Sequence, residues 1–313
     1  MHTTHHRHIT LSRLVALMLV ALLLTSCSTL HYTGVNRLRS YTITHTDVPQ
    51  AFDGYRIAFA SDFHLESKFK QRQLQGAVKA LQATAPDLLL LGGDYQEGCH
   101  HVEPLFEALA KATPPDGTYA VMGNNDYERC TELIRQAMKK HHIHLLEDTI
   151  THVHRANDSI ALWGANPYRQ QYPTVQSSSF KAQSSSLTNE GLNATAQSQQ
   201  PTYTLLLTHT PDYVEEPEAA QAHLALAGHT HGGQITLLGL YAPVTASKYG
   251  SRLLTGLRHS THGVPIIISN GLGTSRYPIR LFAPTDIIII TLKRTSANTK
   301  HQSLPLDTKL PPP

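Results

Sequence analysis

Short apolar runs alternate with segments of helical periodicity in the first half of the chain. Residues 56–60, 88–91 and 119–122 are mostly apolar, which is typical of buried strands, and small and polar residues follow each run. Apolar residues recur three and four positions apart between these runs, for example over residues 74–81, and Pro86 ends that first helical segment. The alternation predicts parallel strands joined by helices.

The second half of the chain predicts more strands. They cover residues 159–163, 203–208, 224–227, 265–269 and 287–292. In sheets of this kind, functional residues collect just beyond the carboxyl ends of the strands. The polar residues that follow the strands are therefore the first candidates for a site.

The other segments are arranged around one large domain, residues 55–295. Residues 28–54 are a polar lead-in and are predicted to be a linker. Residues 170–200 are rich in Gln and Ser and have almost no large apolar side chains, so we expect a mobile insertion. The Pro-rich tail, residues 296–313, is predicted to be disordered.

Residues 1–27 are predicted to be a targeting segment. Arginines precede an apolar run, residues 14–24, which is too short to span a hydrocarbon core of ~30 Å. The run resembles a bacterial lipoprotein signal, which predicts lipidation of Cys27, a cell-membrane location and a domain that faces the periplasm or the exterior. An uncleaved N-terminal anchor with a cytoplasmic domain is the alternative, which Arg37 and Arg39 favour.

Composition and charge exclude some classes of protein. The 313 residues are 40% hydrophobic and 16% charged, with a formal charge of +3, as in an ordinary globular protein. The small charge, and the lack of a basic stretch interleaved with aromatics, argue against nucleic acid as a partner. Histidine occurs 21 times, so a single His pair carries little weight.

Candidate metal ligands occur in five short segments, four of them directly after a predicted strand. They are carboxylates, an amide and imidazoles next to small residues: Asp62, His64, Asp94, Asn124, His209, His229 and His231. A surface pair or a turn explains each single segment at least as well as a metal site does. Neither explains the ordered combination of the five segments. Nearby glycines keep the backbone narrow, so the ligands can converge. Oxygen and imidazole ligands without a thiolate suit Mn²⁺, Fe or Zn²⁺.

The ordered motifs resemble those of the calcineurin-like metallophosphoesterase family. The matching segments are Asp62-Phe63-His64, Gly93-Asp94, Gly123-Asn124-Asn125-Asp126, His209 and Gly228-His229-Thr230-His231. The resemblance extends over about residues 55–292, and residues 232–235 and 271–280 are similar to a membrane-associated bacterial branch. It implies an α/β fold, a four-layer α/β/β/α sandwich with mixed sheets and a metal site at the strand carboxyl ends.

The resemblance also implies how the ligands are shared. One divalent metal ion would be bound by Asp62, His64, Asp94 and His231. The second would be bound by Asp94, Asn124, His209 and His229, so that Asp94 bridges the two. The ions, manganese, iron or zinc, would share a hydroxide that attacks phosphorus. The chain is therefore expected to be a hydrolase of phosphodiester or phosphoanhydride bonds.

One position departs from the family pattern. Where the family usually has a histidine that bonds the phosphate and protonates the leaving group, this chain has Asn125. An amide cannot act as an acid near neutral pH, and such help is worth ~10²–10⁴-fold. We expect Asn125 and Asp126 to be catalytic, and the substrate to have an acidic leaving group, as a phosphoanhydride has. The alternatives are a replacement acid among the histidines of residues 141–154, or a slower enzyme.

The branch resemblance implies a membrane partner and a lipid-linked substrate, such as the pyrophosphate of UDP-2,3-diacylglucosamine. Arg276 and Arg280 are candidates for binding its phosphate or headgroup, or are surface charges. A general phosphodiesterase or phosphomonoesterase of the cell envelope, or a metal-binding module with reduced catalysis, is the alternative. The sequence predicts no oligomeric state.

Two cysteines and one tyrosine complete the candidates. Cys99 lies five residues beyond Asp94, and Cys130 lies four residues beyond Asp126. Both therefore follow the same edge of neighbouring predicted strands. They form either a disulfide that closes a loop of ~30 residues, worth ~3–4 kcal/mol, or two free thiols. Tyr168, just before the predicted insertion, is a candidate for a substrate lid or for the core.

Overall fold

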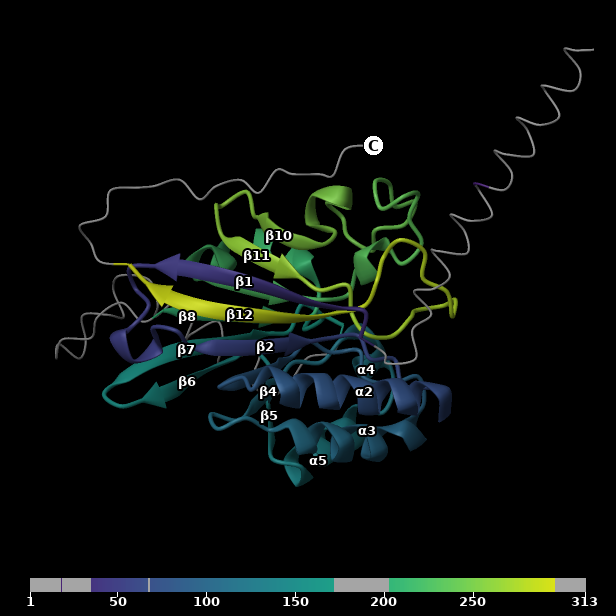
Figure 1. Cartoon of the computed structure of the whole chain (residues 1–313), viewed down its shortest axis with the longest axis horizontal. Coiled ribbons are helices and arrows are strands. Elements are labelled where there is room, and N and C mark those ends of the chain that lie inside the picture. Colours follow the sequence, from purple (N-terminus) through teal and green to yellow (C-terminus); the bar gives the residue numbers. More distant parts are fainter. Residues whose placement is uncertain (1–17, 19–34, 67, 172–202, 296–313) are drawn as a thin grey trace, which may run out of the picture.

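Two six-stranded sheets pack face to face in the computed structural model, which describes residues 18, 35–66, 68–171 and 203–295 (Figure 1). The first sheet has the order β1 (Arg37–His45), β12 (Asp286–Arg294), β2 (Arg56–Ala60), β3 (Leu88–Leu91), β4 (Thr118–Ala120), β5 (Ile143–Leu145). The second has the order β10 (Gly256–His259), β11 (Pro265–Ile268), β9 (Leu224–Ala227), β8 (Thr204–Thr208), β7 (Asp158–Ala165), β6 (Thr149–Arg155).

Both sheets are mixed. Strands β2 to β5 pair in parallel, as the alternation with helices predicts, whereas β12 is antiparallel to β2. In the second sheet β7, β8, β9 and β11 are parallel, and the two outer strands are antiparallel to their neighbours. Apolar side chains such as Phe59, Leu90 and Leu205 fill the space between the sheets.

Helices cover the outer face of the first sheet (Figure 1). They are α2 (Lys68–Thr84), α3 (Val102–Leu109) and α5 (Thr131–Lys140), while the short α4 (Asn124–Glu128) follows β4. The predicted apolar positions of α2, among them Leu74 and Leu81, are buried against this sheet. Short 3₁₀ turns, η2 (Cys99–His101) and η3 (Ala110–Ala112), flank α3.

The outer face of the second sheet is covered differently. In the described residues its layer consists of the 3₁₀ helices η5 (Pro211–Glu215), η6 (Pro217–Gln221) and η8 (Gly250–Leu253). Trp163 of β7 packs beneath them in an apolar cluster that includes Tyr213 of η5. The predicted α/β fold with two mixed sheets is confirmed, with a fourth layer of 3₁₀ turns instead of α-helices.

The predicted linker is wrong over much of its length, because Arg37–His45 form strand β1. All nine residues pair in parallel with β12, from Arg37 opposite Asp286 to His45 opposite Arg294. Tyr41 and Ile43 pack against the apolar layer between the sheets. The following 3₁₀ turn η1 (Gln50–Phe52) buries Phe52. This segment is therefore part of the folded domain.

Several predicted segments lie outside the described residues. They are the targeting segment with Cys27, apart from Met18, the predicted insertion from residue 172 onward, and the tail 296–313. Among the described residues, no helix has the length and apolar character needed to cross a membrane.

Candidate metal centre

All seven candidate ligands follow strands, and both sheets contribute. Asp62 and His64 follow β2, Asp94 follows β3, Asn124 begins α4 after β4, His209 follows β8, and His229 and His231 follow β9. The carboxyl ends of these strands meet at one end of the two packed sheets, so their loops converge.

One group of ligands contains Asp62, His64 and His231. The Nε2 of His231 lies 3.6 Å from the Oδ1 of Asp62 and 3.2 Å from the Nε2 of His64. All three side chains are buried. Such a set of one carboxylate and two imidazoles can hold a divalent cation.

The second group contains Asp94, His209 and His229. The Nδ1 of His229 lies 3.1 Å from the Nε2 of His209, which is 3.4 Å from the Oδ2 of Asp94. The same Oδ2 lies 3.5 Å from the Nε2 of His64 in the first group. One carboxylate oxygen thus faces both groups, which is the position that a bridging ligand needs.

Asn124 lies beside the second group. Its Oδ1 accepts a hydrogen bond from the hydroxyl of Tyr168 at 3.4 Å, and the ring of Tyr168 is 6.2 Å from that of His209. Tyr168 therefore lies at the site and is partly buried. This position is compatible with both predicted roles, a substrate lid and a core residue.

The backbone at the site is unusual for residues with side chains. Asp62, His64, Asp94, His229 and His231 have φ values between 43° and 69°, in the left-handed region. Most side chains are disfavoured there, and such conformations cluster at functional sites. Glycine is required where loops touch, because a Cβ on Gly123 would lie 2.1 Å from the Oδ1 of Asp94.

Protonation of the ligands follows from burial and from their neighbours. Burial would raise the pKa of Asp94, but His209 beside it outweighs that effect and holds the pKa well below its usual range. Burial would lower the pKa of His209, but Asp94 raises it to about 10. Burial and then His209 lower the pKa of His229 to about 4, and burial lowers that of His231 well below its usual value. These last two imidazoles are neutral near pH 7, the form in which imidazole binds metal.

The donor set thus fits two divalent cations: two adjacent groups of carboxylate and imidazole donors that share Asp94, without thiolate. The model of the calcineurin-like phosphoesterase family matches residues 55–233, more than half of the chain. The chain belongs to the calcineurin-like phosphoesterase family. It is a metal-dependent phosphoester hydrolase.

Bacterial relatives of this phosphoesterase extend over most of its length. It is 26% identical over 266 residues to the uncharacterized metallophosphoesterase YkuE of Bacillus subtilis, covering 82% of this chain and 85% of the relative. It is 27% identical over 277 residues to an uncharacterized metallophosphoesterase of Aquifex aeolicus, covering 88% and 98%. The crystal structure of TT1561 of Thermus thermophilus aligns with a TM-score of 0.44 at 15% identity, over 70% of this chain and 90% of that one.

Glu97 is a residue of this phosphoesterase that the sequence reasoning missed. Its Oε1 lies 2.5 Å from the Nδ1 of His64, on the side of the ring away from the other ligands. The hydrogen bond to His64 lowers the pKa of Glu97. A carboxylate on the second ring nitrogen fixes the orientation of a ligand histidine. The only signal in the sequence is that Glu97 follows Asp94 by three residues.

Asp126 has a positioning role in the structure, and its predicted catalytic role stays a prediction. Its side chain is fully buried, and its oxygens accept hydrogen bonds from the backbone N–H groups of Asp94 (2.7 Å), Tyr95 (3.0 Å) and Gly123 (2.8 Å). Burial raises its pKa to about 7. Asp126 therefore joins the loops after β3 and β4 and positions Asp94.

Arg280 has a similar positioning role, and its predicted contact with substrate stays a prediction. Its guanidinium donates hydrogen bonds to the backbone carbonyls of His231 (3.0 Å), Asn270 (2.7 Å) and Gly273 (2.9 Å), and its Nη2 lies 3.1 Å from the Nδ1 of His231. These contacts hold the loop of His231. Arg276 is exposed, and its role as a substrate contact stays a prediction.

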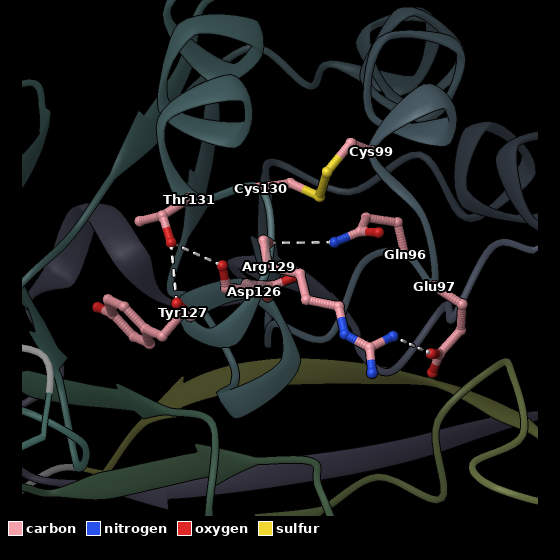
Figure 2. Close-up of a disulfide and its surroundings, with 8 residues drawn as sticks. All are labelled: Gln96, Glu97, Cys99, Asp126, Tyr127, Arg129, Cys130 and Thr131. Carbon is pink, nitrogen blue, oxygen red and sulfur yellow. Dashed lines mark hydrogen bonds and ion pairs between the residues drawn. A yellow bond between two sulfur atoms is a disulfide. The ribbon is translucent and has the colours of Figure 1, made fainter.

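Cys99 and Cys130 form a disulfide, which decides between the two alternatives. Figure 2 shows that it joins the loop of Glu97 to the turn after Asp126, with Arg129 extended toward Glu97. The Nη1 of Arg129 lies 3.7 Å from the Oε2 of Glu97. The disulfide thus connects the loop of Glu97, which contacts His64, to the turn after Asp126, which bonds the backbone of Asp94.

A cavity of about 400 Å³ adjoins the second ligand group. Its lining includes His229, the aromatic side chains Tyr168 and Tyr249, the cationic side chains Arg169 and Lys248, and the acidic side chains Asp212 and Glu216. Cavities of this size accept small ligands. Its position next to a metal ligand makes it the candidate substrate cavity.

Proposed function

We propose that this phosphoesterase hydrolyses a phosphoanhydride, or an ester with a similarly acidic leaving group, at a membrane surface. The observation that carries the proposal is the position of Asn125. Its Nδ2 lies 3.3 Å from the Oε1 of Glu97 and 3.3 Å from the Nδ1 of His64, and its Oδ1 accepts from the Nδ2 of Asn124 at 2.9 Å. An amide therefore stands beside the ligands, where the family usually has a histidine.

The chemistry of the leaving group follows from that amide. Asn125 can donate a hydrogen bond to a phosphoryl oxygen but has no proton to give to an alkoxide near neutral pH. A phosphate or nucleoside monophosphate departs as a stable anion and loses little without an acid.

Four of the five histidines considered as a replacement acid contact residues outside the two ligand groups. The Nε2 of His141 lies 3.0 Å from Glu103, His144 stacks on Tyr119, and His152 and His154 lie side by side on β6. These contacts support the anhydride over a substrate that needs a protonated leaving group.

Two divalent cations, when bound, supply a nucleophile at neutral pH and neutralise the phosphoryl oxygens. The residues of the chain position this chemistry. Glu97 orients His64, and Asp94 faces both ligand groups. Asn125 places a donor near the reacting phosphoryl group, where a fixed donor strengthens as charge develops.

The cavity beside His229 supports a nucleotide-like or sugar-like leaving group. Tyr168 and Tyr249 offer ring faces, and the exposed Lys248 offers a positive charge to an anionic group. A lipid-linked anhydride of the UDP-diacylglucosamine type combines these features with a membrane location, and we propose it as the substrate class.

Lipidation of Cys27 and a domain that faces the periplasm or exterior remain part of the proposal. An outward-facing domain would be separated from cytosolic UDP-lipids and would act on another anhydride. A UDP-lipid substrate requires the alternative, a cytoplasmic domain on an N-terminal anchor. Protease access to the domain in intact and permeabilised cells distinguishes the two orientations.

The test compares turnover by the metal-reconstituted chain of a UDP-sugar-type anhydride, an alkyl phosphodiester and bis-p-nitrophenyl phosphate. We expect fast cleavage of the first and third and slow cleavage of the second. Faster cleavage of the alkyl diester contradicts the proposal and favours a general envelope phosphodiesterase. No turnover of any of the three, with metal bound, favours a metal-binding module.

A further inference from the structure

Large apolar side chains are exposed on two loops that follow His231. They are Ile235, Leu237, Leu238, Leu240, Tyr241 and Val244 on the first loop, and Tyr277 and Ile279 on the second, with exposed fractions from 39% to 79%. We call this set the apolar loop surface. Soluble monomers rarely expose so many large apolar side chains together, and such patches mark interaction sites.

Hydrogen bonds join the two loops into one structure. The Nε2 of Gln234 donates to the carbonyl oxygens of Ser275 (2.9 Å) and Tyr277 (3.0 Å). The backbone N–H of Thr236 donates to the carbonyl of Leu281 at 3.0 Å. Because Gln234 lies three residues beyond His231, the surface is built directly on the loop of a metal ligand.

The tip of the first loop points apolar side chains into solvent. The N–H of Leu237 donates to the carbonyl of Tyr241 at 2.8 Å, and that of Leu240 to the carbonyl of Leu237 at 2.9 Å. Leu238, at φ 54°, is in the left-handed region that a bulky residue avoids. Leu240 is 79% exposed. Leu238 therefore has a strained backbone, although its side chain is not buried in the core.

The charged side chains of residues 231–285 are all cationic. Residues 231–285 contain no Asp or Glu, and their charged side chains are Lys248, Arg252, Arg258, Arg276 and Arg280. Lys248 and Arg276 are exposed on the same two segments as the apolar side chains. Asp212 accepts a hydrogen bond from the backbone N–H of Lys248 at 2.9 Å, and Glu215 pairs with Arg252 at 2.7 Å. The exposed Lys248 and Arg276 beside exposed apolar side chains complement an anionic lipid surface.

The N-terminal segment enters the domain beside the second loop. The backbone N–H of Asn36 donates to the Oγ1 of Thr285 at 3.0 Å, and that of Arg37 donates to its carbonyl at 3.1 Å. Figure 1 shows β1 beginning at the end of the molecule where this loop leads into β12. The first residues of the folded domain, Asn36 and Arg37, therefore lie next to the segment that follows the second loop.

We propose that the apolar loop surface inserts into the headgroup region of a bilayer that contains anionic lipid. Leucine and tyrosine side chains on protruding loops bury their apolar area there, and Lys248 and Arg276 face lipid phosphates. The surface forms a membrane contact of its own, distinct from the predicted N-terminal anchor, and holds the metal centre next to the bilayer. Its link to a lipid substrate rests on the proposed function, but the contact itself requires no turnover.

The test uses the full chain with one added tryptophan. The single native tryptophan, Trp163, is 1% exposed, so an added one reports its own surroundings. Leu240→Trp is compared with the control Leu133→Trp, which is on α5 in the helical layer and 47% exposed. Both are mixed with vesicles of phosphatidylethanolamine and phosphatidylglycerol that contain brominated or ordinary phosphatidylcholine, and Leu238→Trp serves as a second reporter.

We expect both proteins to float with the vesicles, and brominated lipid to quench the emission of Leu240→Trp at least about twofold more than that of Leu133→Trp, since interfacial insertion reaches about 5–10 Å. Equal quenching of the two overturns the proposal, as does failure of both to bind. Emission of Leu240→Trp that is already blue-shifted without lipid and stays unquenched also overturns it, because protein would then cover the surface. Quenching as expected, in a chain that cleaves no phosphoester, leaves the membrane contact standing and rejects the proposed function.

Discussion

The backbone of the metal centre holds its side chains in position before any ligand contact is counted. Asp62, His64, Asp94, His229 and His231 all have positive φ, and each such residue costs on the order of 1–3 kcal/mol. The conformations persist because the ends of β2, β3 and β9 and the contacts of Asp126 and Arg280 fix the loops. The fold thus arranges the ligands before a cation binds.

Glu97→Gln tests the carboxylate behind His64. The amide can still bond the Nδ1 but carries no charge to orient and polarise the ring, so we expect a roughly 10–100-fold loss in metal affinity or activity. Metal titration of the variant measures it, with Glu132→Gln on the exposed side of α5 as the matched control. Equal affinity of Glu97→Gln and the control would remove the role assigned to Glu97.

Asn125→His tests the account of the leaving group. A histidine here restores a group that can protonate an alkoxide, so turnover of an alkyl phosphodiester should rise by about 10²-fold or more. Turnover of bis-p-nitrophenyl phosphate, whose leaving group is acidic, should change little. Steady-state kinetics on both substrates measures this difference. An equal change in turnover of both substrates would contradict the claim that the wild-type chain lacks a leaving-group acid at Asn125.

At the scale of single residues, the sequence predicts ligands better than their supports. The ordered motifs identify the ligands because each motif follows a strand end, where convergence is geometrically required. Glu97 and Asp126 depend on how the loops turn after β3 and β4, and no local pattern encodes that. Asp126 belongs to a matching motif, yet its oxygens point to backbone N–H groups.

Among the elements, the interior strands of the two sheets were predictable and the edge strands were not. Strands β2, β3 and β9 occupy the expected residues because they are buried on both faces and read as apolar runs. Strand β1 lies at the edge of its sheet with its residues half-buried or exposed, so its polar composition reads as a linker. Its pairing with β12, some 250 residues away, is a tertiary contact that no window of sequence contains.

The disulfide gives a prediction about the loops between elements. Cys99 and Cys130 are 31 residues apart, so removing the cross-link in Cys99→Ala/Cys130→Ala should lower the free energy of unfolding by ~3–4 kcal/mol. Denaturant unfolding of the double variant, with Cys27→Ala as the control, measures this loss. A difference below ~0.5 kcal/mol would show that the pairing does not constrain the chain in solution.

At the scale of the whole molecule, the metal centre joins the two sheets. Asp62, His64 and Asp94 come from the first sheet, and His209, His229 and His231 from the second. Bound cations therefore resist separation of the sheets as well as local loop motion. Membrane contact through the apolar loop surface would act on the same end of the molecule, because its first loop begins at Gln234.

Removing metal should consequently destabilise the whole domain. Ligand that binds only the folded state adds about 2.7 kcal/mol per site at a hundredfold excess over Kd. Calorimetry of the chelator-treated chain should show a lower Tm, which rises again on addition of Mn²⁺. The Asp94→Ala variant, which lacks the shared ligand, should show a much smaller rise. A Tm that is insensitive to chelation and Mn²⁺ would contradict the coupling.

The central claim is that two cation sites share Asp94, and counting bound metal tests it most directly. Titration of the metal-free chain with Mn²⁺, followed by elemental analysis of the dialysed protein, should give two equivalents per chain and a parallel rise in hydrolysis of bis-p-nitrophenyl phosphate. Asp94→Ala should hold fewer equivalents and lose activity. One equivalent or none in the wild-type chain, with activity unaffected by chelation, would contradict the account.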